Sequence, residues 1–301
     1  MIEVAGLTKR YGRTLAVDDL TFTVEPGRVT GFLGPNGAGK STTMRMMLGL
    51  DRPSAGRVLI DGRPYPELTE PLRRVGALLE ARAVHGGRRA RHHLLWLAQT
   101  NRIPLARVDE VLELVGLTSV ARKRVKGYSL GMNQRLGIAA ALLGDPGVLL
   151  FDEPVNGLDP EGIVWLRTLL RDLAGQGRTV LVSSHLMSEM ALTAEHLVVI
   201  GRGRLLADTT VAEFIAGNST SFVRITTPDP ARLRAVFAAE GVQVTDIEGG
   251  ALAAHGVDPA RAGELVAAHG LVVHEMALRQ ASLEEAFVRM TASAVEFREG
   301  S

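Results

Sequence analysis

Short, mainly apolar runs without alternating polar residues recur along the first two thirds of the chain. They cover residues 29–33, 148–151 and 180–182. Such uninterrupted runs are typical of strands buried on both faces, as in a parallel sheet covered by helices. Between the first two runs, apolar residues at helical spacing predict helices over 94–98, 108–115 and 136–143. The pattern therefore predicts an α/β fold for this part of the chain.

Shorter strand-like stretches separated by turns fill the first 80 residues. The predicted strands are 2–4, 20–24, 57–62 and 72–80, and the predicted turns are 11–13, 25–27 and 52–56. The last of these strands ends in an acidic residue, Glu80. The basic stretch 82–93 that follows is interpreted as a solvated arm. Its His92–His93 pair lacks a third ligand at helical spacing, which argues against a metal site.

The last third of the chain alternates between strand-like and helical stretches. Strands are predicted over 221–227, 242–247, 251–255 and 271–276, and helices over 229–240, 259–269 and 283–291. The β-α-β-β-α-β order suggests a small ferredoxin-like sheet. Residues 216–221 are expected to form a linker, which divides the chain into domains 1–216 and 217–301. The second domain has no clustered acids and no glycine loop, so we expect an accessory or dimer-stabilising role.

Composition narrows the class of protein. The 301 residues are 46% hydrophobic, which is enough for substantial cores, and the net charge of +1 gives no reason to expect a nucleic-acid partner. No cysteine is present, which excludes disulfides and thiolate chemistry. The first residues do not resemble a signal peptide, and no apolar run approaches the roughly 18 residues of a membrane span. We therefore expect a cytoplasmic protein; any membrane part would come from another chain.

A glycine-rich loop, Gly34–Thr42, is the strongest chemical signal. It fits the pattern G-x-x-x-x-G-K-[ST] and lies between the predicted strand 29–33 and a helix-like stretch. A strand that feeds a glycine loop and then a helix directs backbone N–H groups and the positive end of a helix dipole towards one point. Lys40 would reach the β- and γ-phosphates of a nucleotide, and the Ser41 hydroxyl would ligate Mg²⁺.

Two further predicted strands end in polar residues with matching chemistry. The run 148–151 ends in Asp152 and Glu153, and the run 180–182 leads to His185. Because ligands of open α/β sheets bind at the carboxyl ends of the strands, these side chains are expected near the glycine loop. Asp152 would hold Mg²⁺ directly or through water, and Glu153 would polarise an attacking water. A neutral His185 could hydrogen-bond the γ-phosphate or that water.

Together with the stretch Tyr128–Arg135, these motifs resemble the ATPase subunit of ATP-binding cassette (ABC) transporters over about residues 1–215. The resemblance implies a P-loop ATPase with a mixed sheet core and a helical signature subdomain over about 81–145. It places Glu80 at the Q-loop as a further metal ligand and His185 at the switch histidine. The implied ATP contacts are Tyr11, stacked on the adenine, Val17, the Walker A residues Asn36, Gly37, Ala38, Gly39, Lys40, Ser41 and Thr42, the signature residues Ser129 and Gly131, and the D-loop residue Asp159.

Two motifs depart from the family pattern, the signature and the Q-loop. The signature, usually Leu-Ser-Gly-Gly-Gln, reads Tyr128-Ser129-Leu130-Gly131-Met132, which keeps the serine and one glycine that contact ATP on the opposite subunit. Glu80 stands where the family usually has glutamine, and its carboxylate adds negative charge near the phosphates. In these features the chain resembles the bacitracin-resistance, lantibiotic-immunity and drug-export branch. The stretch Ala281–Phe287 likewise resembles the tail of drug-export ATPases.

The resemblance implies a homodimer that sandwiches two ATP molecules and binds a membrane permease at the inner face of the cell membrane. It points to export of a peptide antibiotic or another drug, with ATP and Mg²⁺ required and no nucleic acid expected. Two alternatives remain open: a soluble cassette ATPase that acts on ribosomes or nucleic acid, and a nucleotide-dependent regulator with little turnover. Import instead of export is also open, and the transported molecule is not encoded in this subunit.

Overall fold

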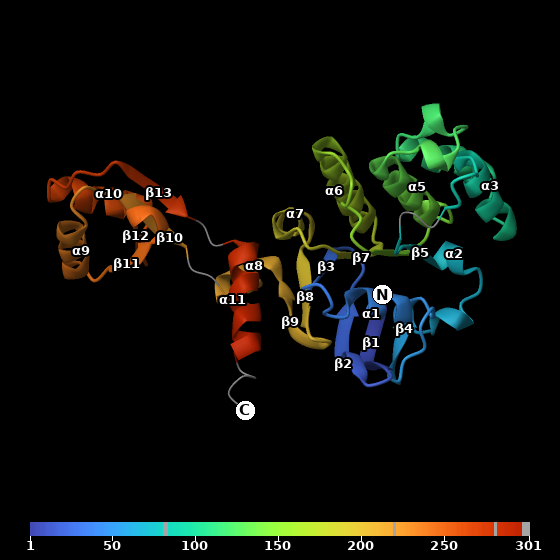
Figure 1. Ribbon diagram of the computed structural model, residues 1–301, viewed down its shortest axis with the longest axis horizontal. Helices are drawn as coiled ribbons and strands as arrows, with labels where there is room; N and C mark the ends of the chain where they lie inside the picture. The colour runs from blue at the N-terminus through green and yellow to red at the C-terminus, as the bar shows by residue number, and fades with distance from the viewer. Residues whose placement is uncertain (81–83, 219–220, 280–281, 297–301) are drawn as a thin grey trace. The chain divides into compact units, whose positions relative to one another are not determined.

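A computed structural model describes residues 1–80, 84–218, 221–279 and 282–296 (Figure 1). The chain divides into two compact units, Met1–Val211 and Ala212–Ser301. The sequence placed this boundary at residue 216, within a linker over 216–221. That linker is wrong for residues 216–218, because the helix α8 (Val211–Asn218) continues through them. Residues 219–220 lie outside the described residues.

A six-stranded sheet forms the centre of the first unit, in the order β5-β6-β7-β3-β8-β9. Its strands are β3 (Val29–Leu33), β5 (Val75–Leu78), β6 (Val148–Phe151), β7 (Thr179–Ser183), β8 (His196–Gly201) and β9 (Arg204–Thr210). The first five are parallel, and β9 pairs antiparallel with β8. Strands β3, β6 and β7 are buried along their whole length, which confirms the interpretation of the apolar runs.

A second, antiparallel sheet has the order β2-β1-β4. It is made of β1 (Ile2–Tyr11), β2 (Thr14–Val24) and β4 (Ala55–Ile60), and the first two strands are longer than the sequence predicted. The helix α1 (Lys40–Met47) lies between this sheet and the six-stranded one (Figure 1). One buried cluster joins all three, with Phe22 and Phe32 in ring contact at 5.6 Å. The glycine loop is therefore anchored on a continuous core.

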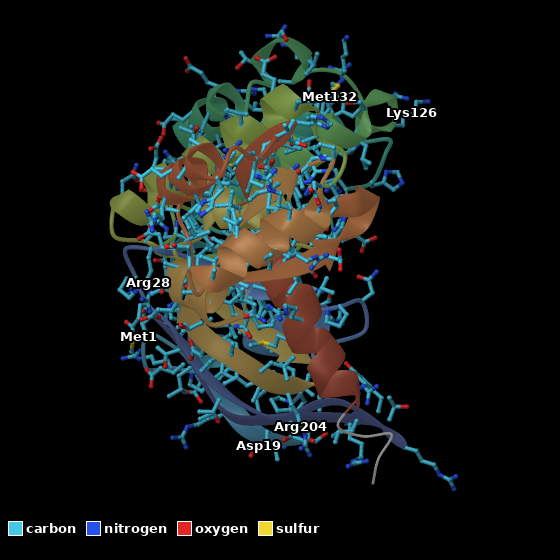
Figure 2. The ribbon with its side chains drawn as sticks, turned by 90° about the vertical axis from the view of Figure 1, so that its left-hand side faces the viewer. Met1, Asp19, Arg28, Lys126, Met132 and Arg204 are labelled. Carbon is cyan, nitrogen blue, oxygen red and sulfur yellow. The ribbon has the colours of Figure 1, made fainter. Side chains whose placement is uncertain are left out.

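Helices cover the other side of the six-stranded sheet. They are α3 (Ala90–Thr100), α4 (Ala106–Leu114), α5 (Leu130–Leu142), α6 (Pro160–Gly175) and α7 (Met187–Thr193), with short 3₁₀ turns at 118–120 and 125–127. A further 3₁₀ turn at 65–67, which packs against the cluster around α1, and the short helix α2 (Pro71–Arg74) lie between β4 and β5 in the chain. Figure 2 shows the helical end of the unit, with Lys126 and Met132, opposite the sheet end, with Asp19 and Arg204. The helices α3 to α5 fall inside the expected subdomain of about 81–145.

Two predictions in this unit were wrong in part. The strand expected over 72–80 begins as the helix α2, since Pro71 is pre-organised for a first helical position, and only 75–78 pair with β6. The arm expected over 82–93 ends in a helix, because residues 90–93 form the first turn of α3 with Ala90 buried. Residues 81–83 lie outside the described part of the chain.

The second unit contains a four-stranded antiparallel sheet in the order β11-β12-β10-β13. Its elements are β10 (Phe222–Thr226), α9 (Pro230–Ala239), β11 (Gln243–Ile247), a 3₁₀ turn at 248–250, β12 (Ala251–His255), α10 (Pro259–Ala268), β13 (Glu275–Arg279) and α11 (Leu283–Glu296). This order and connectivity are those of a split β-α-β ferredoxin-like sheet. The core joins Val223 and Leu252 of the sheet to Phe237 of α9 and Leu265 of α10.

The last strand of this sheet was predicted too early in the chain. The sequence placed it over 271–276, whereas β13 covers Glu275–Arg279. It pairs antiparallel with β10, so that Phe222 lies opposite Arg279 and Thr226 lies opposite Glu275. The apolar residues at 271–273 suggested an earlier start. The start of β13 is set instead by its pairing with β10, which cannot be read from local sequence. Within the described residues, no helix is long and apolar enough to cross a membrane.

Close packing of α5 on β5 gives a testable stability prediction. A Cβ at Gly76 would lie 2.1 Å from the backbone oxygen of Ala141. Gly76→Ala should therefore lower the free energy of unfolding by about 1–3 kcal/mol, through overpacking. Urea denaturation of the full chain measures the change. Gly147→Ala is the matched control, since a Cβ there meets nothing within 4 Å; equal effects of the two variants would contradict the prediction.

Candidate functional site

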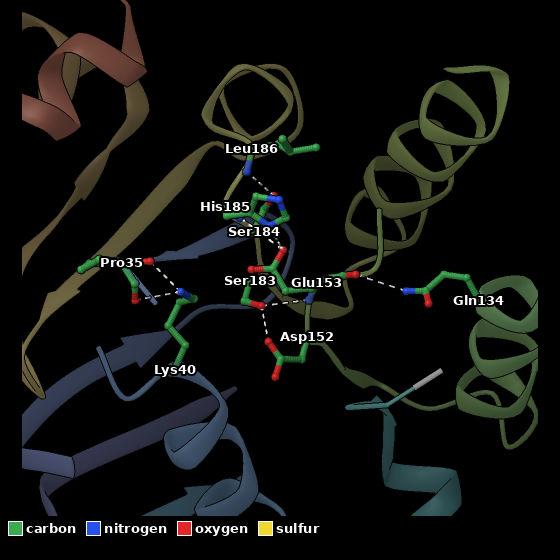
Figure 3. Close-up of polar contacts among 10 residues, drawn as sticks. Pro35, Lys40, Gln134, Asp152, Glu153, Ser183, Ser184, His185 and Leu186 are labelled. Atoms are coloured by element: carbon green, nitrogen blue, oxygen red, sulfur yellow. Dashed lines mark hydrogen bonds and ion pairs between the residues drawn. The ribbon is translucent and has the colours of Figure 1, made fainter. Parts of the chain in front are cut away.

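The carboxyl ends of three parallel strands converge on one place in the first unit. Phe32 of β3 pairs with Ser183 of β7, and Phe151 of β6 pairs with Val182. The residues that follow each strand therefore emerge side by side at one edge of the sheet, as expected for a ligand site in an α/β fold. They are the glycine loop after β3, Asp152 and Glu153 after β6, and Ser184 and His185 after β7 (Figure 3).

The glycine loop borders a cavity of about 240 Å³. The lining residues are Ala16, Asn36, Gly37, Ala38, Gly39, Lys40, Ser41, Thr42, Asp152 and Glu153. Gly37 and Gly39 have φ angles of 79° and 105°, a region that favours glycine. A Cβ at Gly39 would also lie 2.6 Å from the backbone oxygen of Ala16. The loop can thus fold closely around a ligand only because these positions lack side chains.

Lys40 begins the helix α1 and is almost fully buried, with 7% of its surface exposed. Its ammonium donates hydrogen bonds to the backbone oxygens of Gly34, at 2.5 Å, and Pro35, at 3.3 Å (Figure 3). Burial lowers the pKa of Lys40, and the negative charges of Glu153 and Asp152 oppose that shift. The site therefore combines a buried cation and two carboxylates around the open end of a helix N-terminus.

A buried hydroxyl holds the two carboxylate residues in place. Ser183 Oγ donates to Oδ1 of Asp152 at 2.5 Å and accepts the backbone N–H of Glu153 at 2.9 Å. Gln134 of α5 donates to the backbone oxygen of Glu153 at 3.2 Å. These bonds secure Glu153 at a φ of 50°, a conformation that non-glycine residues adopt rarely. Backbone strain of this kind often occurs at functional sites.

His185 lies directly against the Glu153 side chain. Its Nδ1 is 2.6 Å from Oε2 of Glu153, and its backbone N–H donates to the same oxygen at 3.3 Å. With the proton on Nδ1, the ring donates a hydrogen bond to the carboxylate. In the neutral ring Nε2 is then the hydrogen-bond acceptor. The His185 side chain is 51% exposed, against 22% for Glu153, so the pair is open to solvent on the histidine side.

The signature residues and Asp159 have structural partners within the chain. Ser129 is the N-cap of α5 and accepts the Met132 N–H at 3.1 Å, and Asp159 caps α6 through the Gly162 N–H at 3.0 Å. A Cβ on Gly131 would lie 2.8 Å from the Gly157 oxygen, and one on Gly157 would lie 2.2 Å from Leu130 Cγ. Leu130, one of the departures from the family signature, thus packs on the loop that precedes α6.

Only part of the sequence-predicted set meets at the cavity. Asn36 to Thr42, Asp152 and Glu153 line it, and His185 contacts Glu153. Val17 is fully buried and packs beside Gly39, while its neighbour Ala16 provides the lining. Tyr11, Glu80, Ser129, Gly131 and Asp159 are not among the lining residues.

Three functional candidates were missed by the sequence analysis: Ala16, Gln134 and Ser183. Ala16 carries no chemical signal at all. Gln134 lies within the stretch Tyr128–Arg135, and Ser183 lies between the run 180–182 and His185. Their partners, however, are 19 and 30 residues away from them in the sequence. A polar residue at the end of a fully apolar strand was the one available clue for Ser183.

The residues fit a nucleotide phosphate with a divalent cation. The Ser41 hydroxyl and the Asp152 carboxylate border the same cavity, and both are oxygen donors of the kind that Mg²⁺ prefers. Across the described ranges, no group of three or more histidine, aspartate or glutamate side chains could hold a metal ion by itself. A cation at Ser41 and Asp152 would therefore need phosphate oxygens or water as further ligands.

Comparisons with known proteins agree with this geometry. A family model described as ABC transporter matches residues 17–156. A model described as an AAA domain, putative AbiEii toxin of a type IV TA system, matches residues 122–191, and a domain family of unknown function matches 221–284.

Two curated proteins are similar over most of the chain. The bacitracin transport ATP-binding protein BcrA of Bacillus licheniformis is 44% identical over 211 residues, or 69% of each chain. The Nod factor export ATP-binding protein I of Paraburkholderia xenovorans (strain LB400) is 37% identical over 300 residues, or 96% of each chain.

Solved structures share the fold. The ATP-binding subunit of an ABC transporter superposes with a TM-score of 0.67 at 26% identity, over 72% of this chain and 92% of that chain. A dimeric ATP-binding cassette in a post-hydrolysis state, bound to ADP and Pi, superposes with a TM-score of 0.62 at 24% identity, over 70% of this chain and 99% of that chain.

The Ser183 hydroxyl gives a second testable prediction. Ser183→Ala leaves the Glu153 N–H without its buried acceptor and should lower the free energy of unfolding by about 1–3 kcal/mol. Thr168→Ala is the control, since it removes an exposed hydroxyl that donates to the Val164 oxygen and should cost less than about 0.5 kcal/mol. Denaturant unfolding compares the two. A Ser183→Ala protein as stable as the control would argue against this role.

Proposed function

Because the chain belongs to the ATP-binding subunits of ABC transporters, we propose that it powers a separate membrane permease that exports a peptide antibiotic or another drug. The chain is an ATPase of this family. The observation that carries the proposal is the meeting of Lys40, Asp152 and Glu153 around one cavity, with His185 against Glu153. The direction of transport is supported by the relative named for Nod factor export, and a peptide antibiotic as cargo by the relative named for bacitracin transport.

In the proposed mechanism, the glycine loop and Lys40 bind the β- and γ-phosphates of ATP. Lys40 exchanges its bonds to the Gly34 and Pro35 oxygens for bonds to phosphate, which carries more negative charge. Ser41 and Asp152 would hold Mg²⁺, with Glu80 as a further candidate ligand from the segment after β5. The ion, when bound, neutralises charge that develops on the phosphates.

Glu153 is proposed as the general base. Its carboxylate takes a proton from water as the water oxygen attacks the γ-phosphorus and the bond to the ADP oxygen breaks. His185 orients this carboxylate through the 2.6 Å contact between Nδ1 and Oε2. Ser183 and Gln134 hold the Glu153 backbone, so the base is fixed from both sides.

We further propose that two copies of the chain sandwich two ATP molecules. Ser129, Gly131 and Asp159 line no part of the cavity in their own chain, but Ser129 and Gly131 begin the helix α5, whose N-terminus suits an anion. In the proposed dimer Ser129 and Gly131 contact the γ-phosphate of the ATP bound to the other copy. The dimeric cassette with the same fold supports this arrangement.

The base is tested by Glu153→Gln in the full chain. The variant should bind ATP normally, since the amide keeps the size of the side chain, but it cannot accept the proton. Phosphate release should fall by at least about 100-fold. Glu161→Gln, an exposed change in the first turn of α6, is the control and should keep wild-type turnover. Normal turnover of Glu153→Gln would remove Glu153 from this role, and a wild type without turnover would favour a regulator.

The permease is tested by recovery of partners from native membranes. The surface of α3 is the proposed contact, because Trp96 is 49% exposed and Arg88 lies 4.9 Å from its ring centroid. Tagged Glu153→Gln protein with ATP should recover a hydrophobic, polytopic partner. Arg88→Glu should reduce recovery, whereas Arg171→Glu, an exposed change on α6, should not. Recovery of ribosomes or nucleic acid in place of a membrane protein would refute the transporter assignment.

A further inference from the structure

We propose that Asp51, held by Arg45, is a positioning residue that fixes Tyr11 for stacking on the base of the nucleotide. The proposal rests on the proposed ATP site and adds a residue to it. Tyr11 ends the strand β1, and 46% of the residue is exposed. Asp51 lies in the turn that follows the helix α1, far from Tyr11 in the sequence. None of the transporter motifs includes this residue.

Three hydrogen bonds meet at the Asp51 carboxylate. The Tyr11 hydroxyl donates to Oδ2 at 2.9 Å, and Arg45 Nε donates to the same oxygen at 2.7 Å. Arg45 Nη2 also approaches Oδ1 at 3.4 Å. Only 18% of the Asp51 side chain is exposed, against 48% for Arg45. A carboxylate that accepts from both neighbours therefore fixes the free end of the tyrosine ring.

Further bonds join the end of β1 to the same turn. Lys9 Nζ donates to the backbone oxygen of Arg52 at 2.7 Å, and the Arg10 N–H donates to Ser54 Oγ at 3.0 Å. The Ser54 N–H donates to the Thr8 oxygen at 2.8 Å. The backbone beneath Tyr11 is thus tied to residues 52–54, while Asp51 holds its hydroxyl. Both attachments come from one turn.

That turn continues directly from the helix that begins at the phosphate loop. The Leu50 N–H donates to the Arg45 oxygen at 2.9 Å, which anchors the turn on the last part of α1. Eight helical residues span about 12 Å. One rigid element therefore presents the phosphate-binding residues at its start and the support for Tyr11 at its end. The spacing between phosphate and base is set by this helix and its turn.

The face of the ring available to a base also follows from the contacts. The Lys9 ammonium lies over the ring, 4.8 Å from its centroid. Lys9 occupies one face, so a purine would stack on the opposite one. Burial and the Asp51 hydrogen bond raise the pKa of Tyr11, and the Arg45 hydrogen bond lowers the pKa of Asp51. At neutral pH the hydroxyl is thus a donor and the carboxylate an acceptor.

The test compares ATP with inorganic tripolyphosphate, which keeps the phosphates and lacks the base. Binding of each to the full chain is measured by titration calorimetry for wild type, Tyr11→Phe, Asp51→Ala and the double variant. Each single change should weaken ATP binding about threefold to tenfold, the loss of one hydrogen bond, and leave tripolyphosphate binding unchanged. The double variant should be no weaker than the single ones, since Asp51 acts through Tyr11.

Two further variants complete the design. Asp51→Asn keeps an oxygen acceptor for the hydroxyl and should recover part of the ATP affinity. Asp109→Ala breaks the Arg91–Asp109 pair, another exposed pair with both bonds at 2.9 Å, and should change neither affinity. Folding is checked by the unfolding midpoint of each variant.

The inference is overturned by unchanged ATP affinity in Tyr11→Phe and Asp51→Ala, by equal losses for ATP and tripolyphosphate, or by additive losses in the double variant. In each of these cases the wild type still binds ATP, so the proposed function stands. A wild type that binds no ATP would overturn both the inference and the proposed function. Selective, non-additive loss of ATP binding supports the positioning role.

Discussion

Parallel pairing of β6, β7 and β3 is the constraint on which the site depends. The register places Phe151 beside Val182 and Phe32 beside Ser183, so that a glycine loop, two carboxylates and a histidine leave the sheet at one edge. A shift of one residue in either pairing would turn alternate side chains to the opposite face. Full burial of all three strands makes such a shift costly, because each has apolar side chains packed on both faces.

Polar groups buried at this edge are held by bonds between strands. Ser183 serves Asp152 and Glu153 together, and Gln134 of the helical part reaches the Glu153 backbone. Because Gln134 lies on α5, a movement of that helix relative to the sheet would displace the hydrogen bond to the backbone of Glu153, the proposed base. The packing of Leu130 on Gly157 adds a second contact between the start of α5 and the loop after β6. Signature and hydrolytic residues are thereby mechanically joined within one chain.

The helix α1 links the two ends of the proposed nucleotide site. Its N-terminus opens at the phosphate cavity, and the turn after it supports Tyr11 through Asp51. The second unit has its own core around Phe237 and Leu252, and its sheet presents none of the residues of the ATPase chemistry. The two units therefore differ in what organises them. In the first unit, sequence motifs surround a ligand cavity, whereas the second unit is two helices packed on a sheet.

Local patterns in the sequence determined much of this protein. The glycine loop between a strand and α1, the position of Asp152 and Glu153 after a strand and the burial of the apolar strands follow from short-range geometry and were predicted correctly. The binding of phosphate and metal by these residues stays a prediction. Tertiary structure alone decided where β13 begins and that Ser183, Gln134 and Asp51 form hydrogen bonds with residues of the proposed site. Serine, glutamine and aspartate are common surface residues, and only pairing between segments 19 to 40 residues apart gives them these partners.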